Sequence, residues 1–273
     1  MHREAGSLKI TRSALIMFAS LAGAILLFAG YIFIYQLAPF EGPLNDWALS
    51  LITMLGALFA AAFATAIYLH YHPEDYPRKV WLNLMIGCWL WFVAELIWGI
   101  LDYVLGEVTS PGLADAFWAG GFIFFTIAFY HQYNIISPAR HKRARNIALG
   151  AWVGVLLIPF VALSVLRMFT AESYVNYCYP LADLAVGIAG LMLIFVFQGG
   201  ALTRPWLGLV VFSISDLFYA WAEQTGVYAW STENSNLFTL AIDASYFAAY
   251  LILGLGFVGH WLLINYGLRG DQN

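Results

Sequence analysis

The chain has 273 residues, of which 62% are hydrophobic and only 10% are charged, and its formal net charge is −4. A soluble domain of this size carries about 25% charged residues. The composition therefore excludes a globular protein with a fully solvated surface and is typical of a protein that crosses a membrane several times. The small net charge gives no indication of nucleic-acid binding. The two cysteines, Cys88 and Cys178, provide neither a disulfide framework nor the spacing of a zinc site.

Eight apolar segments are long enough to cross a membrane, which takes about 20 mainly apolar residues. They cover residues 13–38, 46–70, 79–104, 113–135, 146–168, 178–199, 205–228 and 237–267. The first segment follows a polar, basic stretch and so also has the layout of a signal peptide. It is longer than a signal-peptide core, and no small-residue cleavage site clearly ends it. We therefore expect an all-α, polytopic integral membrane protein with short loops and no appended soluble domain.

The basic residues predict the orientation of these spans. With eight spans, eleven of the twelve lysines and arginines fall on one side of the membrane, and only Arg167 falls on the other. Because lysine and arginine gather in cytoplasmic loops, we expect a protein of the plasma membrane with both termini in the cytoplasm.

Two parts of the sequence share a layout. The shared features are two acids seven residues apart, a turn, and an acid near the start of the next span: Glu95, Asp102 and Asp115 in one part, Asp216, Glu223 and Asp243 in the other. The pattern predicts one membrane domain made of two four-helix halves, residues 1–136 and 137–273. Since each half holds an even number of spans, both halves would have the same orientation, as in transporters built from parallel repeats.

Glu95 and Asp216 are the leading candidates for a site, because both lie within predicted spans. An acid at membrane depth costs a few kcal/mol on insertion scales and usually faces the bundle interior or a water-filled cavity. Trp91, Trp98 and Asp102 share one helix face with Glu95. Ser213, Ala220 and Glu223 share one face with Asp216 in the same way.

We expect the two acidic faces to line a ligand-binding cavity that opens to the outer side. Its candidate residues are Glu95, Asp216, Trp91, Trp98, Asp102, Glu223, Asp115 and Asp243. Other roles remain open for most of the acids. Asp46, Asp115, Asp183 and Asp243 each come near the start of a span, where aspartate caps a helix or complements its dipole. Asp102 and Glu223 have the alternative of ordinary interfacial charges, and Glu95 and Asp216 that of protonated acids bonded to a neighbouring helix.

No cofactor or metal site is predicted. His70, His131 and His260 fall near the inner ends of their spans, and histidines on different helices can bind haem or a chlorin. Their spacing is not specific, and a position in the headgroup zone is the alternative. No lysine lies in the interior of any span, since Lys79 is the first residue of its span, which excludes a retinal Schiff base.

The segment AELIW…SPGLADAFWAGGF resembles the membrane-embedded sensor regions that precede diguanylate cyclase and phosphodiesterase domains in many bacteria. The matching residues are Glu95, Trp98, Pro111, Ala114, Asp115 and Trp118. No cytoplasmic output domain follows them in this sequence. The resemblance therefore implies a free-standing sensor or a subunit that serves a separate partner.

A second resemblance is to the lysoplasmalogenase (YhhN-like) family, whose members are also eight-helix membrane proteins. LGLVVFSISDLFYAW, followed by SYFAAYLILGLG, is similar to the second half of that family, with Asp216 at its acidic position. VAELIW followed by FTIAFYHQY is similar in layout to the first half, with Glu95 where the family has aspartate. The early Lys-Pro motif of the family is absent. The resemblance implies an intramembrane lipid hydrolase in which Glu95 and Asp216 act as acid and base.

The leading functional prediction is a multi-pass membrane sensor or accessory module. It would bind a small apolar or cationic molecule or a lipid, and would signal through helix shifts to a cytoplasmic partner or within a larger membrane complex. The basic loop SPARHKRAR is the expected docking or lipid-headgroup surface. The lipid hydrolase and a pigment- or haem-binding subunit are the alternatives.

Overall fold

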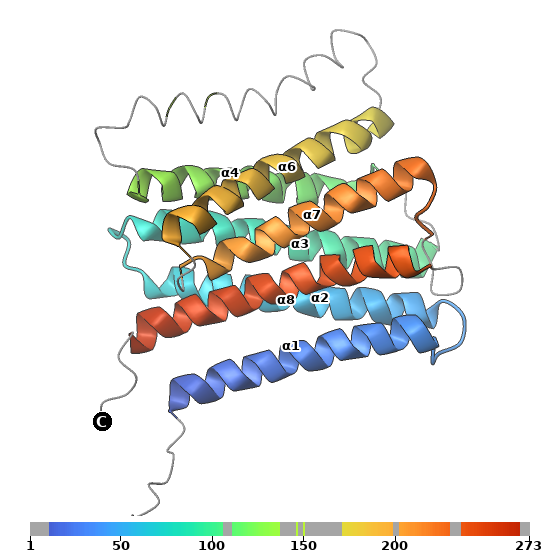
Figure 1. The fold of residues 1–273 in the computed structure, drawn as a ribbon, viewed down its shortest axis with the longest axis horizontal. Helices are drawn as coiled ribbons and strands as arrows, with labels where there is room; N and C mark the ends of the chain where they lie inside the picture. Colours follow the sequence, from blue (N-terminus) through green and yellow to red (C-terminus); the bar gives the residue numbers. More distant parts are fainter. Residues whose placement is uncertain are drawn as a thin grey trace, which may run out of the picture.

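The computed structural model describes residues 11–105, 111–136, 146, 150, 171–198, 202–229 and 236–267. These residues form seven helices and no strand (Figure 1). The helices are α1 (Arg12–Leu37), α2 (Leu44–His70), α3 (Pro77–Leu105), α4 (Leu113–Ile136), α6 (Ala171–Phe197), α7 (Arg204–Thr225) and α8 (Leu237–Tyr266). All seven are long and apolar enough to cross a membrane, which confirms the predicted all-α membrane protein.

Seven of the eight predicted spans coincide with these helices. The predicted span 146–168 lies outside the described residues except for residues 146 and 150. α4 and α6 run in the same direction, so Ile136 and Ala171 lie at opposite ends of the bundle (Figure 1). The largest difference at a boundary is in α6, which begins at Ala171 rather than at residue 178. This helix includes the polar stretch AESYVNY, which a hydropathy criterion leaves out.

The bundle has two chemically different ends. The basic end is the end at which α1, α3 and α7 begin, with Arg12, Arg78, Lys79 and Arg204 in their first turns. The acidic end is the opposite one, at which α2, α4 and α8 begin. Asp46 and Asp115 lie there in the first turns of α2 and α4. The Asp115 carboxylate accepts a hydrogen bond of 2.7 Å from the amide of Gly112, the residue before the helix, as an acid at the third helical position does in a capping box.

The predicted capping roles of Asp183 and Asp243 are wrong. Asp183 lies in the interior of α6, because that helix begins twelve residues earlier, at Ala171. α8 is capped by Asn236, whose side chain accepts hydrogen bonds from the amides of Phe238 and Thr239 at 2.9 Å each. Asp243 therefore lies beyond the first turn, where no free amide remains to be capped.

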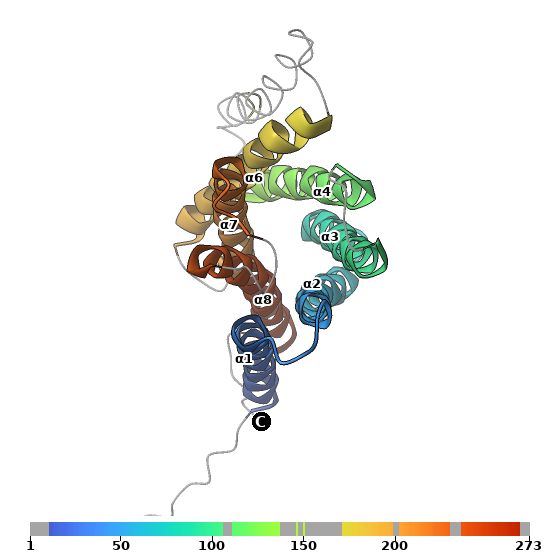
Figure 2. The same ribbon diagram turned by 90° about the vertical axis from the view of Figure 1, so that its right-hand side faces the viewer.

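Viewed along the helices, the bundle is a ring (Figure 2). α3 packs on α4 and α2, and α7 packs on α8 and α6, while α2 also packs on α8 and α1 lies outside α2 and α8. Glycines set the closest approaches. A Cβ at Gly208 of α7 would lie 2.6 Å from the Cα of Leu253 on α8, and one at Gly256 would lie 2.6 Å from the Arg204 carbonyl oxygen. The two helices therefore have little freedom to move apart or slide near the basic end.

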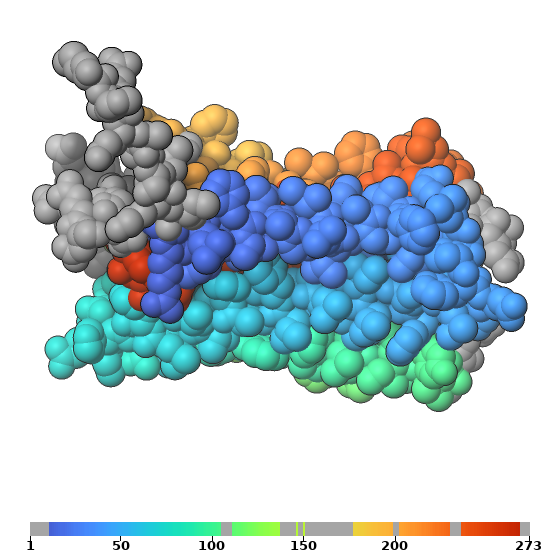
Figure 3. Space-filling model, turned by 90° about the horizontal axis from the view of Figure 1, so that it is seen from below, coloured from blue at the N-terminus to red at the C-terminus, as the bar shows by residue number. Residues whose placement is uncertain are grey.

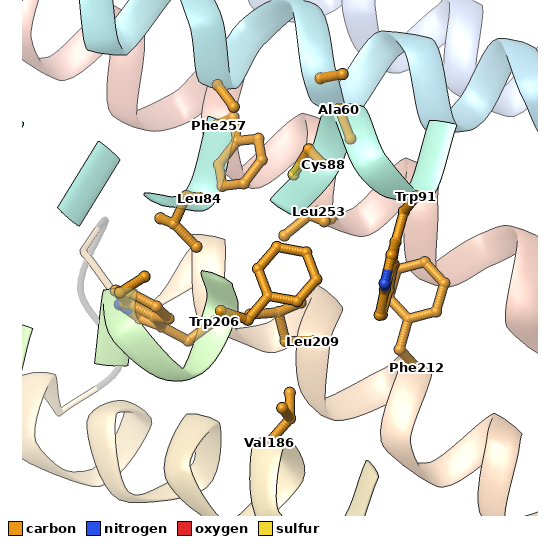
Figure 4. Packing of buried hydrophobic residues seen from close by; sticks show 14 of the residues in the cluster. Ala60, Leu84, Cys88, Trp91, Val186, Trp206, Leu209, Phe212, Leu253 and Phe257 are labelled. Carbon is orange, nitrogen blue, oxygen red and sulfur yellow. The ribbon is translucent and has the colours of Figure 1, made fainter. Parts of the chain in front are cut away.

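Large aliphatic and aromatic side chains fill the bundle on the basic-end side of Glu95. Leu84 and Cys88 of α3, Leu209 of α7 and Phe257 of α8 point toward one another there (Figure 4). The outer surface is also apolar, as expected for helices that face lipid. On the face formed by α1 and α2 (Figure 3), exposed large side chains include Phe18, Leu26 and Phe33 of α1.

Candidate ligand-binding site

Glu95 lies inside the bundle and binds two tyrosines of another helix. Its side chain is only 7% exposed. The hydroxyl of Tyr246 donates a hydrogen bond of 2.5 Å to Glu95 Oε1, and the hydroxyl of Tyr250 donates one of 2.7 Å to the same oxygen. Both tyrosines belong to α8, four residues apart, so they lie on one face of that helix. The cost of burying the Glu95 carboxyl is therefore offset by neutral hydroxyl donors.

Asp216 forms a carboxyl pair with Asp183. Asp216 belongs to α7 and is half-buried, whereas Asp183 belongs to α6 and is only 2% exposed. The two side chains lie close enough for a hydrogen bond between their carboxyls. Because two carboxylates have no hydrogen between them, this bond holds a proton. Asp183 Oδ1 is buried and accepts no hydrogen bond from a donor group of the described residues.

A glycine allows this carboxyl pair to form. Gly187 lies one turn after Asp183 on α6, and a Cβ at this position would lie 2.8 Å from the Cβ of Ser213 on α7. Ser213 in turn precedes Asp216 by three residues and lies on the same face of α7. The missing side chain at Gly187 lets the two helices approach closely where the two aspartates face each other.

Aromatic side chains connect the pair to Glu95. The ring of Phe212, one turn before Asp216, lies 4.8 Å from Trp91, 5.3 Å from Tyr246 and 4.4 Å from Tyr250 between centroids. Glu95 also lies close enough to Asp216 for their charges to interact. We refer to Glu95, Asp183, Asp216, Tyr246 and Tyr250 as the central acidic cluster. The structure thus brings the two predicted acidic stripes together around Glu95 and Asp216.

Asp243 has its own set of partners nearer the acidic end. The hydroxyls of Tyr35 on α1 and Tyr228 in the α7–α8 connection donate to its two oxygens, each at 2.8 Å. Burial and the neighbouring Asp243 charge raise the pKa of Tyr228. Tyr228 therefore keeps its proton and remains a donor at neutral pH. Through these two bonds the Asp243 carboxylate links α8 to α1 and to the α7–α8 connection.

Of the other predicted site residues, Trp91 reaches the central acidic cluster only through ring contacts, and Trp98, Asp102 and Glu223 lie outside it. Trp91 is buried among aromatic rings as part of the apolar core, and Trp98 packs on Trp118 with centroids 5.7 Å apart. Asp102 is half-buried near the acidic end, where Asp46 is close enough to repel it. Glu223 is exposed at the same end of the bundle.

Sequence reasoning missed Asp183, Tyr246 and Tyr250 as members of the cluster. The two tyrosines carried a usable signal, since polar groups at i and i+4 in an otherwise apolar span mark one helix face. Asp183 carried a weaker signal, because its distance from the start of α6 could not be read from hydropathy.

The acids of the cluster have no cationic neighbours in the described part of the chain. Its lysines and arginines all lie in the first turns of α1, α3 and α7. At 1.5 Å per residue, Arg78 is roughly 25 Å from Glu95 along α3. The described residues also contain no group of three or more His, Cys, Asp or Glu side chains that could hold a metal ion. Of the three predicted histidine candidates, His260 is buried beside Trp81 and Tyr71 near the basic end.

Comparisons with protein-family models, curated proteins and solved structures found no match. The resemblances to bacterial sensor regions and to lysoplasmalogenases therefore stay predictions. The function is inferred below from the contacts of the described residues.

Proposed function

We propose that the chain is a multi-pass membrane sensor or accessory module that binds a small ligand at the central acidic cluster and signals to a cytoplasmic partner. The observation that carries this proposal is the attachment of Glu95 on α3 to Tyr246 and Tyr250 on α8. It is a buried polar connection between two helices that are far apart in the sequence.

The hydrogen bonds between Glu95 and the two tyrosines favour a role in switching the relative position of α3 and α8 over a purely structural role. Apolar side chains of similar volume often stabilise a buried site as well as charged or polar ones do. A buried acid held by hydroxyl donors can also exchange them for the donors of a ligand. A ligand that replaces Tyr246 at Glu95 would favour a different position of α8 relative to α3, to the extent that it binds that position better. Because α7 and α8 pack through glycines near the basic end, such a shift would move them together.

The proposed architecture has eight crossings in two parallel halves. Three features of the described helices support it: α4 and α6 run in the same direction, α3 packs on α4 as α7 packs on α8, and α2 packs on α3 as α6 packs on α7. The basic end then faces the cytoplasm, as the positive-inside rule requires. The expected docking loop SPARHKRAR (137–145) lies outside the described residues.

A thermal-shift experiment tests ligand binding at the cluster. The purified protein in lipid nanodiscs is heated with each of a set of probes: benzylammonium, benzyl alcohol, benzoate and lysophosphatidylcholine. We expect at least one probe to raise the Tm of the wild type, and Glu95→Gln to remove that shift. Glu223→Gln, which changes an exposed acid at the acidic end, is the matched control and should keep it. A shift that survives Glu95→Gln, or no shift with any probe, would contradict the proposal.

A lipid hydrolase is the second candidate, and the Asp183–Asp216 pair is the observation that favours it. Two carboxyls that share a proton provide an acid and a base at one place. The structure thus supports Asp183, rather than Glu95, as the partner of Asp216. Purified protein would be assayed on ether- and ester-linked lysolipids. Turnover that is lost in Asp216→Asn and Asp183→Asn but kept in Glu223→Gln would establish this function, and no turnover on any of them would exclude it.

A further inference from the structure

We propose that Lys79 on α3 and His131 on α4 form a binding site for the phosphate group of an anionic membrane phospholipid. We refer to these two side chains, which lie at the basic end of the bundle, as the Lys79–His131 pair. The proposal goes beyond the proposed function and does not rest on it, because the pair shares no residue with the central acidic cluster.

One tyrosine ring contacts both basic groups. Lys79 Nζ lies 5.4 Å from the centroid of the Tyr76 ring, and the His131 ring packs edge to face on the same tyrosine with centroids 6.0 Å apart. Lys79 also lies close enough to His131 for its charge to act on the imidazole. Two basic groups from neighbouring helices therefore meet around one ring, where α3 begins and α4 approaches its end.

No acid neutralises the pair within the part of the chain that the structure describes. Neither Lys79 nor His131 makes a salt bridge to an aspartate or glutamate there. The nearest acid along the chain, Asp75, instead accepts a hydrogen bond of 2.8 Å from the His72 amide. Two basic groups that lie together without an acid attract an anion, because it interacts favourably with both. The pair is therefore complementary to a negatively charged group.

The pair is open to a ligand, whereas the neighbouring Arg78 is already engaged. The Arg78 guanidinium donates a hydrogen bond of 3.0 Å to the Tyr68 hydroxyl and lies 4.7 Å from the centroid of that ring. Lys79, in contrast, is exposed, and Tyr76 is 41% exposed. His131 is half-buried and carries an N–H donor in either protonation state. The pair therefore lies at the protein surface, where an anion can approach it.

The surface beside the pair favours a lipid over free phosphate. Ile127 and Ile123 precede His131 by one and two turns on the same face of α4, and Ile123 is 61% exposed. On α3, the half-buried Ile86 follows Lys79 by two turns. The acyl chains of a lipid whose phosphate binds the pair would lie along these apolar side chains, toward the middle of the membrane. Basic groups between helices at the cytoplasmic side bind the head groups of acidic phospholipids.

Two lipids with the same acyl chains and different head-group charge test the proposal. Native mass spectrometry measures the binding of phosphatidylglycerol and phosphatidylcholine to the unaltered protein at pH 7. We expect phosphatidylglycerol to bind at least about fivefold more tightly, the factor that one basic residue supplies beside an anionic lipid. Inorganic phosphate, added in large excess over the lipid, should not displace it. Because these comparisons use only the wild type, they do not depend on the folding of a variant.

Variants then locate the site. Lys79→Gln and His131→Phe should each weaken phosphatidylglycerol binding by about fivefold. The phenylalanine keeps a ring against Tyr76 and removes the N–H donor. Arg12→Gln, which removes an exposed charge of α1 at the same end of the bundle, is the matched control and should leave binding unchanged.

Three results would overturn the proposal. Equal binding of the two lipids would show that the site does not select negative charge. Full binding in both variants of the pair, or an equal loss in Arg12→Gln, would place the lipid elsewhere on the basic surface. Displacement of phosphatidylglycerol by inorganic phosphate would identify free phosphate, rather than a lipid, as the ligand of the pair.

Discussion

Trp91 and Phe212 contact each other edge to face, with their ring centroids 4.8 Å apart, and each precedes an acid of the central acidic cluster by one helical turn. Trp91 leads to Glu95 on α3, and Phe212 leads to Asp216 on α7. The contact fixes the two helices at the same depth, so that the acids of the two predicted halves lie close together. It also connects the central acidic cluster directly to the apolar core.

The hydroxyls on Glu95 provide the first prediction. Tyr250→Phe removes one of two donors from a buried carboxyl and should lower the free energy of unfolding by about 1–2 kcal/mol. The double variant Tyr246→Phe/Tyr250→Phe should lower it further, because Glu95 then has neither hydroxyl. Reversible unfolding in mixed micelles measures these changes. Tyr177→Phe, at an exposed position of α6, is the control and should have no effect.

Gly187 provides the second prediction. Gly187→Ala would place a Cβ 2.8 Å from the Cβ of Ser213 and should force α6 away from α7 at the Asp183–Asp216 pair. We expect the free energy of unfolding to fall by about 1–3 kcal/mol, the usual cost of overpacking. Gly23→Ala on α1 is the matched control, because a Cβ there meets no atom within 4 Å. Equal stability of the two alanine variants would show that the close approach of α6 and α7 is not required.

The cap of α8 provides the third prediction. Asn236→Ala removes the acceptor for two free amides and should cost about 1 kcal/mol of stability. Asn236→Asp should restore most of it, since aspartate caps helices equally well. Thermal unfolding measures the change. If Asp243 capped α8 instead, Asn236→Ala would leave the Tm unchanged.

The fourth prediction concerns orientation. Glu41 lies in the α1–α2 connection at the acidic end, and Glu74 lies in the α2–α3 connection at the basic end; both are exposed. In a background with Cys88 and Cys178 replaced, Glu41→Cys should react with a membrane-impermeant maleimide on intact cells. Glu74→Cys should react only after the cells are opened. The reverse pattern would place the basic end outside and contradict the positive-inside rule.

The sequence by itself determined the class of the protein and most helix boundaries. A run of about 20 apolar residues needs internally satisfied backbone hydrogen bonds in lipid, which leaves the helix as its structure whatever its neighbours are. It also predicted that Glu95 and Asp216 belong to one site, because acids are rare in such runs and the same spacing recurs in both parts of the chain.

The tertiary structure alone decided which groups these acids contact. A helix that is apolar on all sides has no amphipathic pattern to show which face turns inward, so its rotation depends on packing with neighbours. The pairing of Asp183 with Asp216 depends on the contact at Gly187, and the pairing of Glu95 with Tyr246 joins residues 151 positions apart. Asp183 was predicted to cap a helix but lies in the interior of α6, within the central acidic cluster. The reason is that α6 begins in a polar stretch that hydropathy does not assign to the span.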